Sequence, residues 1–139
     1  MAITTRDSSI DGRRQLGVAA ICFEEPEHAE FTAAILSIDD ARMGAPNFIE
    51  TLMVIEARHR EPGGWELDRI TGNLGLSIVA FDAGHVAAAR EGFRRFGKGR
   101  HYAALNFGDR CTYALAKMLD IPLLFKGNDF SLIDVKPAL

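Results

Sequence analysis

The chain has 139 residues, which suits a single domain with one hydrophobic core. Its 47% hydrophobic and 25% charged residues are ordinary for a folded protein and exclude a disordered or fibrous class. A net charge of −3 means that any binding to nucleic acid must rest on a local basic patch. The sequence has no run of 18 apolar residues and no apolar leader. Its four histidines lack metal-ligand spacing, and both cysteines lie in apolar helical patterns. We therefore expect a reduced, cytoplasmic protein with no membrane span and no zinc site.

Short β-rich runs alternate with amphipathic helical patterns from residue 27 onward. In chain order the pattern predicts a helix to residue 36, a strand at 41–46, a helix at 48–59, a Pro-Gly-Gly break at 61–64 and a helix at 65–73. It then predicts a strand at 76–81, a helix that contains Val86, Ala89, Phe93 and Phe96, a loop at 97–99, a helix from 109, and strands at 122–125 and 132–135. This alternation predicts an α/β fold with a mainly parallel central sheet.

Three carboxylates follow a predicted strand or open a predicted helix. Glu50 comes after the strand at 41–46, Asp129 follows the strand at 122–125, and Asp109 opens a helix. Ligands of open α/β sheets bind beyond the carboxyl ends of the strands, so we expect these side chains to converge within about 10 Å. Crowded carboxylates repel one another unless a cation lies among them, and oxygen ligands favour Mg²⁺ or Mn²⁺. The arrangement is typical of metal-assisted phosphodiester hydrolysis.

Asp109 also has a purely structural interpretation. It is followed by an apolar stripe at helical spacing, which consists of Cys111, Ala114, Leu115 and Met118. Asp109 then sits at the start of this helix, with Thr112 on the same side. Aspartate is a preferred N-cap residue and is stabilised by the positive end of the helix dipole, so a simple cap explains this position as well.

Several segments resemble PIN-domain ribonuclease toxins of the VapC type, in the family's order and at family-like spacing; they are residues 46–50, 96–101, 106–109 and 122–130. The resemblance implies a three-layer α/β/α PIN fold and a Mg²⁺- or Mn²⁺-dependent endoribonuclease that hydrolyses RNA phosphodiester bonds. It also implies a homodimer and a VapB-type antitoxin as partner. The family's second and third acids fall on Glu50 and Asp109, its nearby hydroxyl on Thr112 and its fourth acid on Asp129.

The front of the single domain, residues 1–20, departs from the family pattern. The family opens with an apolar strand that ends in an aspartate, and this aspartate usually lies eleven residues before a Glu-Pro pair. In this chain the pair is Glu25-Pro26, and counting back eleven residues from Glu25 falls on Arg14. Asp7 resembles the missing acid and is a further candidate metal ligand, but it stands seven residues too early and follows no apolar run. Arginines suit a buried strand poorly, so we expect the first strand to be absent, displaced or strained.

A shifted reading frame would explain this departure. One choice of codons for residues 11–19, read one base later, encodes Met-Val-Val-Asp-Asn-Ser-Ala-Leu, the opening that the family leads us to expect. A divergent N-terminus without any change of frame is the alternative.

Basic residues concentrate just before the Asp109 helix; they are Arg94, Arg95, Lys98 and Arg100. A charge run is usually a solvated face, but this position makes RNA binding an equal alternative. Two other functions remain open for the chain as a whole. One is a catalytically impaired PIN scaffold that binds antitoxin or RNA, and the other is a PIN nuclease of RNA processing that has no antitoxin.

Overall fold

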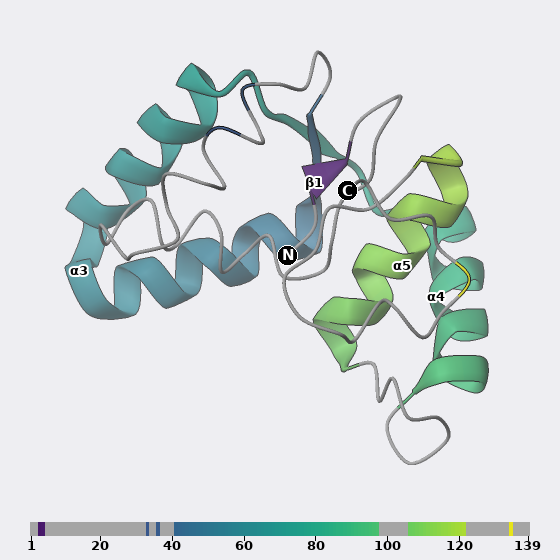
Figure 1. Cartoon of the computed structure of the whole chain (residues 1–139). Helices are drawn as coiled ribbons and strands as arrows, with labels where there is room; N and C mark the ends of the chain where they lie inside the picture. Colours follow the sequence, from purple (N-terminus) through teal and green to yellow (C-terminus); the bar gives the residue numbers. More distant parts are fainter. Residues whose placement is uncertain are drawn as a thin grey trace.

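The computed structural model describes residues 3–4, 33, 36, 41–97, 106–121 and 134. Their helices and strands are, in chain order, β1 (Ile3–Thr4), β2 (Arg42–Gly44), α3 (Ala45–Asn73), β3 (Ser77–Val79), α4 (Ala83–Phe96) and α5 (Phe107–Leu119) (Figure 1). The alternation of strands and helices confirms an α/β fold. None of the helices in the described part of the chain is long and apolar enough to cross a membrane. The strands predicted at 122–125 and 132–135 lie outside the described residues.

The described strands form one sheet in the order β1-β2-β3. β2 runs parallel to β3, with Met43 opposite Ile78, and antiparallel to β1, with Met43 opposite Ile3. The parallel pair agrees with the predicted sheet, whereas no strand is predicted at residues 3–4. Residues 12–16, where the family pattern calls for the first strand, lie outside the described part of the chain.

The end of β2 is set by the start of α3. β2 stops at Gly44, before the predicted end of the strand at residue 46, and Pro46 lies in the first turn of α3. Proline is tolerated there because a first-turn N–H has no partner within the helix. The short strand therefore delivers the chain directly into the helix that carries Glu50.

α3 is bent at Arg60, whose φ of 59° and ψ of −161° are not helical. The break falls one residue before the predicted one at 61–64, since Pro62 takes a first-turn position in the second half of the helix. The second half contains the predicted helix at 65–73, and the two halves form a V in Figure 1. Gly63 permits their contact at the bend, because a Cβ atom there would lie 2.9 Å from Cγ2 of Ile55.

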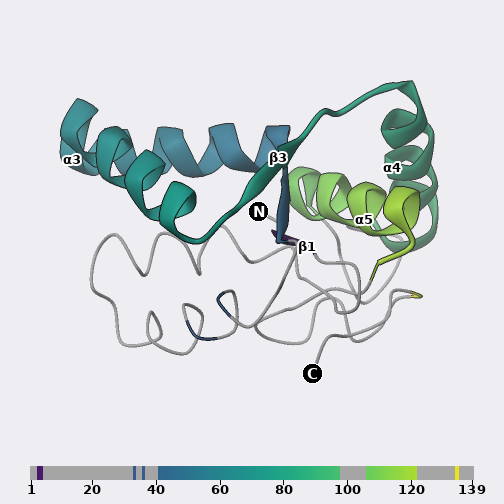
Figure 2. The same cartoon turned by 90° about the horizontal axis from the view of Figure 1, so that it is seen from above.

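α4 and α5 pack against each other, and β3 passes between α3 on one side and this pair on the other (Figure 2). Gly92 of α4 lies over the ring of Tyr113, so that a Cβ atom at Gly92 would come within 2.7 Å of Cδ1. The rings of Phe96 and Tyr113 are 5.7 Å apart between centroids. This close packing fixes the position of α5, which carries Asp109.

The core confirms most of the predicted α5 stripe. Cys111, Ala114 and Leu115 are buried, whereas Met118 is 43% exposed. Met118 differs because its side chain lies over Gly84, at the start of α4, instead of entering the core. The largest completely buried side chains in the described part of the chain are Tyr113, Met43, Ile55, Leu67 and Leu115.

Candidate active site

The start of α3 carries Asn47, which is completely buried, and Glu50, which is exposed. Nδ2 of Asn47 donates a hydrogen bond of 3.1 Å to the carbonyl oxygen of Gly108, at the start of α5. Two helix starts that are distant in the sequence are therefore joined directly. Figure 1 shows the same arrangement, with the first turns of α3 close to α5.

Asp109 belongs to a capping box, but it is not the N-cap residue. The N-cap is Asn106, whose Oδ1 accepts from the Asp109 N–H at 2.9 Å, while Oδ2 of Asp109 accepts from the Asn106 N–H at 3.0 Å. The predicted cap at Asp109 is thus wrong by position, because asparagine is as good an N-cap as aspartate and stands one turn earlier. Asp109 is 6% exposed, so its carboxylate is held firmly at the mouth of α5.

Glu50 approaches the same place from α3. A Cβ atom at Gly108 would lie 2.9 Å from Oε2 of Glu50, so the absence of a side chain at Gly108 makes room for this carboxylate. Its charge also reaches into α5: burial, and then the negative charge of Glu50, raise the pKa of the Cys111 thiol. The structure therefore brings Glu50 close to the peptide that precedes Asp109.

Thr112 is buried one turn further along α5. Its Oγ1 donates a hydrogen bond of 3.1 Å to the carbonyl oxygen of Gly108. The hydroxyl that the sequence places near the third acid thus contacts the Gly108–Asp109 peptide from its own helix, and the Asn47 amide contacts the same carbonyl from α3.

With this geometry in place, three relatives can be compared. Over 119 residues the chain is 47% identical to Ribonuclease VapC of Mycolicibacterium smegmatis, which covers 85% of this chain and 92% of that protein. It is 43% identical to Ribonuclease VapC30 of Mycobacterium tuberculosis over 118 residues, 85% of this chain and 90% of the relative. Ribonuclease VapC36 of the same species is 42% identical over 119 residues, 86% of each chain. The PIN domain matches residues 18–136. The chain belongs to the VapC family of PIN-domain ribonuclease toxins.

VapC ribonucleases in general require a divalent metal ion, act on RNA and are paired with a VapB antitoxin. In this VapC-type chain, the described residues include no group of three or more His, Cys, Asp or Glu side chains that could hold a metal ion. Glu50 and Asp109 supply two carboxylates, while the other predicted acids, Asp129 and Asp7, lie outside the described residues. The predicted convergence of Glu50 with Asp109 remains compatible with the contact at Gly108, and the third ligand stays a prediction.

The predicted RNA-binding residues of this VapC-type chain are in part engaged elsewhere. Nη1 of Arg95 forms an ion pair of 2.9 Å with Oδ2 of Asp134, and Nζ of Lys117 reaches the same oxygen at 3.1 Å. Arg94 is exposed at the end of α4, whereas Lys98 and Arg100 lie outside the described residues. The sequence interpretation missed this ion pair because Asp134 is far from both partners along the chain.

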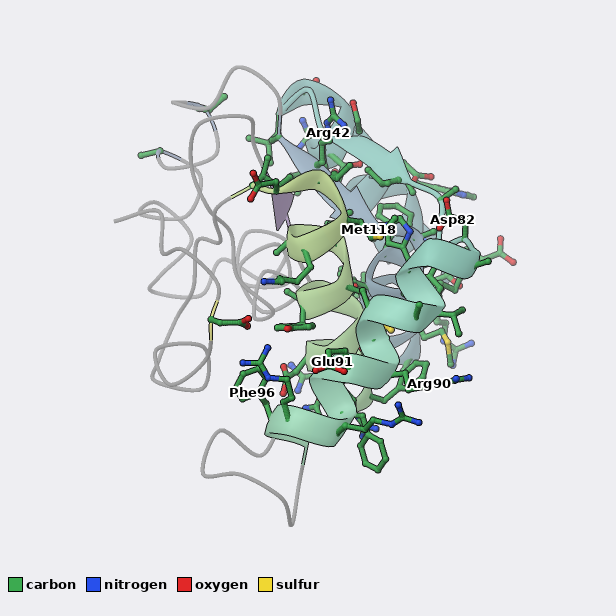
Figure 3. The ribbon with its side chains drawn as sticks, turned by 90° about the vertical axis from the view of Figure 1, so that its right-hand side faces the viewer. Arg42, Asp82, Arg90, Glu91, Phe96 and Met118 are labelled. Carbon is green, nitrogen blue, oxygen red and sulfur yellow. The ribbon has the colours of Figure 1, made fainter. Side chains whose placement is uncertain are left out.

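An apolar groove of about 380 Å³ lies between α4 and α5; its lining includes Phe81, Val86, Ala89, Phe93, Phe107 and Cys111. Phe107 is 74% exposed and Val86 is 48% exposed. At the rim, the guanidinium of Arg110 stacks 4.7 Å above the Phe93 ring centroid. Figure 3 shows Arg90, which also lines the groove, and Phe96 on opposite sides of α4.

Asn47 is the site residue that the sequence interpretation did not single out. It stands three residues before Glu50 in the segment 46–50 that carries the family resemblance. That spacing puts both side chains on the same face of a helix, and it is the feature of the sequence from which Asn47 could have been predicted as a site residue.

Proposed function

We propose that this chain is a cytoplasmic endoribonuclease whose Mg²⁺ or Mn²⁺ site is built on Glu50 and Asp109. The observation that supports this most is that Oε2 of Glu50 lies 2.9 Å from where a Cβ atom of Gly108 would stand, and Gly108 directly precedes Asp109. Carboxylate oxygens are the donors that both ions prefer, so the residues present fit such a metal. Asp129 and Asp7 are the proposed further ligands.

The proposed roles follow from the chemistry of RNA hydrolysis. A bound Mg²⁺ or Mn²⁺ stabilises negative charge at the phosphate and lowers the pKa of water. In the reaction, a water molecule loses a proton as its oxygen forms a bond to phosphorus, the bond to the leaving ribose oxygen breaks, and that oxygen takes up a proton. Glu50 and Asp109 hold the ion, and Thr112 steadies Asp109 through the Gly108 carbonyl. Arg94, Lys98 and Arg100 bind neighbouring phosphates, and Arg95 joins them only by leaving Asp134.

The test is cleavage of fluorescent RNA by the purified full chain with Mg²⁺ or Mn²⁺. We expect cleavage that stops with EDTA and falls at least about 100-fold in Glu50→Gln, because a direct ligand matters at least as much as an outer partner. Glu56→Gln, which removes an exposed charge further along α3, is the matched control and is expected to leave cleavage unchanged. Equal cleavage by wild type and Glu50→Gln contradicts the proposal.

A catalytically impaired PIN scaffold is the second candidate. The observation that favours it is that the PIN match begins at residue 18, after Arg14, where the family count expects the first acid. A cation about 4 Å from a bound metal costs on the order of 4 kcal/mol per unit charge at an effective dielectric of about 20. RNA or antitoxin binding without metal-dependent cleavage identifies the scaffold. A PIN nuclease of RNA processing is distinguished by the absence of a small antitoxin gene immediately upstream.

The proposed partners are RNA, a VapB-type antitoxin and a second copy of this chain. Light scattering on the purified full chain tests the proposed homodimer, and a monomer at all concentrations contradicts it.

A further inference from the structure

We propose that Asn47 is a positioning residue of the nuclease, which sets the place of Asp109 relative to Glu50 by donating its side-chain amide to the Gly108 carbonyl. The inference rests on the proposed function, because it takes Glu50 and Asp109 to be the metal-binding pair. Asn47 itself is completely buried and is not exposed to bulk solvent. Its effect must therefore pass through the hydrogen bond of 3.1 Å to Gly108.

The peptide between Gly108 and Asp109 is held by side chains at both of its polar atoms. Its carbonyl oxygen accepts from Nδ2 of Asn47 at 3.1 Å and from Oγ1 of Thr112 at 3.1 Å. Its N–H donates to Oδ1 of Asn106 at 2.9 Å. The peptide plane fixes the direction in which the Asp109 side chain leaves the backbone. Of these three contacts, the one from Asn47 comes from a different helix.

Asn47 connects this peptide to the turn that carries Glu50. The two residues are three positions apart on α3 and share a helix face. The backbone of Asn47 is in turn steadied by Thr51, whose Oγ1 donates to the Asn47 carbonyl at 2.9 Å. A shift of α5 relative to α3 therefore breaks the Asn47–Gly108 bond and changes the spacing of the two carboxylates together.

The other end of the Asn47 amide indicates that packing alone does not explain the residue. Oδ1 is buried and has no hydrogen-bond partner among the described residues. Burying an unpartnered acceptor is unfavourable, and an apolar side chain of the same size would avoid it. The donor to Gly108 is what asparagine supplies and leucine lacks.

The experiment measures Mn²⁺ binding to the purified full chain by electron paramagnetic resonance, together with thermal unfolding of the metal-free protein. We expect Asn47→Leu to weaken Mn²⁺ binding by roughly 10- to 100-fold, as loss of an outer-shell partner does. Thr71→Val is the matched control: Thr71 is also a buried helical residue, but its hydroxyl donates within the distal half of α3, and we expect unchanged Mn²⁺ binding. Thr112→Val completes a double-mutant cycle, in which the losses in the double variant are expected to be less than additive because both donors serve one carbonyl.

Each outcome decides the matter. Weaker Mn²⁺ binding in Glu50→Gln but unchanged binding in Asn47→Leu overturns the positioning role and leaves the proposed function standing. The same conclusion follows if Asn47→Leu unfolds at a lower temperature without binding Mn²⁺ more weakly. If wild type binds no Mn²⁺, or binds it no better than Glu50→Gln, the proposed metal centre fails and the positioning role fails with it. If Asn47→Leu does not fold, Asn47→Ala carries the same measurement. If neither folds, Asn47 is a structural residue and the inference is wrong.

Discussion

Gly108 leaves room for the carboxylate of Glu50, because a methyl group there would come within 2.9 Å of Oε2. Oε2 is the far end of a flexible side chain, so Glu50 can turn aside at little cost in stability. We therefore expect Gly108→Ala to keep a free energy of unfolding within about 1 kcal/mol of wild type, since alanine also favours helix by up to about that amount. Mn²⁺ binding and RNA cleavage should fall by about tenfold or more, because Glu50 is displaced. Chemical denaturation and Mn²⁺ titration of one preparation check this.

Gly72 provides the comparison for that substitution. It is also a helical glycine, and a Cβ atom there would meet nothing within 4 Å. Gly72→Ala is expected to gain a little stability and to bind Mn²⁺ as wild type does. Unweakened Mn²⁺ binding in Gly108→Ala would show that the position of Glu50 does not matter for the metal.

Asp109→Asn separates the structural role of this residue from its proposed chemical role. Asparagine can still accept the Asn106 N–H, so the capping box survives, and the lost charge near the helix start costs about 0.3–1 kcal/mol. We expect near-normal thermal unfolding and antitoxin binding, with loss of most metal-dependent cleavage. Asp120→Asn, at the other end of α5, keeps a side chain suited to its φ of 49° and serves as the control. Full cleavage by Asp109→Asn would leave Asp109 as a cap alone.

At single positions, sequence reasoning selected residues where chemistry and spacing coincide, and their role as metal ligands stays a prediction. Glu50 and Asp109 were predicted because acids that follow strands or open helices point to one rim. Asn106 was missed as the cap, since two good capping residues stand one turn apart and only backbone geometry chooses between them. Asn47 was missed because its partner is a backbone carbonyl. Every residue has a backbone carbonyl, so residue types do not show which one an asparagine binds.

At the scale of elements, Asp134 links α4 to α5 through Arg95 and Lys117. Burial raises the pKa of Asp134, but hydrogen bonds from these two cations outweigh it and hold the pKa below its ordinary value of 3.8. A carboxyl with a lowered folded pKa adds stability at higher pH and loses it as the pH falls through that pKa. We expect Asp134→Asn to cost about 0.5–1 kcal/mol at neutral pH and low salt. The difference from wild type should shrink below pH 3.8.

Urea unfolding of both proteins from neutral to acidic pH measures this difference. Asp68→Asn, which neutralises an exposed acid on α3, is the control and should cost little at any pH. The same Asp134 charge, after burial, helps raise the pKa of Tyr113 to about 12, so Tyr113 should ionise at lower pH in Asp134→Asn. A stability difference that does not change with pH would contradict the ion-pair account.

The order of the described elements was predictable, and their ends were less so. Helical periodicity gave α4 and most of α5, since their apolar faces pack against each other. The bend of α3 falls at Arg60 instead of within 61–64, because the backbone must leave the helix before Pro62 can start a new turn. β3 spans Ser77–Val79, less than the predicted strand at 76–81, since strand ends depend on the neighbouring strand and not on propensity alone.

For the whole molecule, we expect the first acid to decide between a working and an impaired nuclease. We propose that residues 1–20 come from a shifted reading frame. A version whose residues 11–18 are replaced by Met-Val-Val-Asp-Asn-Ser-Ala-Leu places an aspartate at the position of Arg14. We expect it to cleave RNA at least about 100-fold faster than the present chain, because it gains a direct ligand and loses a cation.

The control for this replacement carries asparagine instead of the new aspartate; it loses the cation but gains no ligand, so it is expected to cleave more slowly than the aspartate version. Resequencing the gene tests the frame itself. A start region that reads cleanly in the present frame would remove the frame hypothesis, while equal cleavage by the aspartate and asparagine versions would remove the role of the first acid.

The peptide between Gly108 and Asp109 also bears on how the protein opens. Amide hydrogens in the first turn of a helix usually lack a partner within the helix and exchange quickly with solvent as the turn frays. The Asp109 amide is instead bound by Asn106, and the carbonyl of the same peptide is bound by Asn47 from the neighbouring helix. Release of this hydrogen requires the Asn106 cap to open, and the bond from Asn47 to the same peptide restrains that opening. Deuterium uptake at Asp109 is therefore expected to be slow and to report the opening of the capped turn.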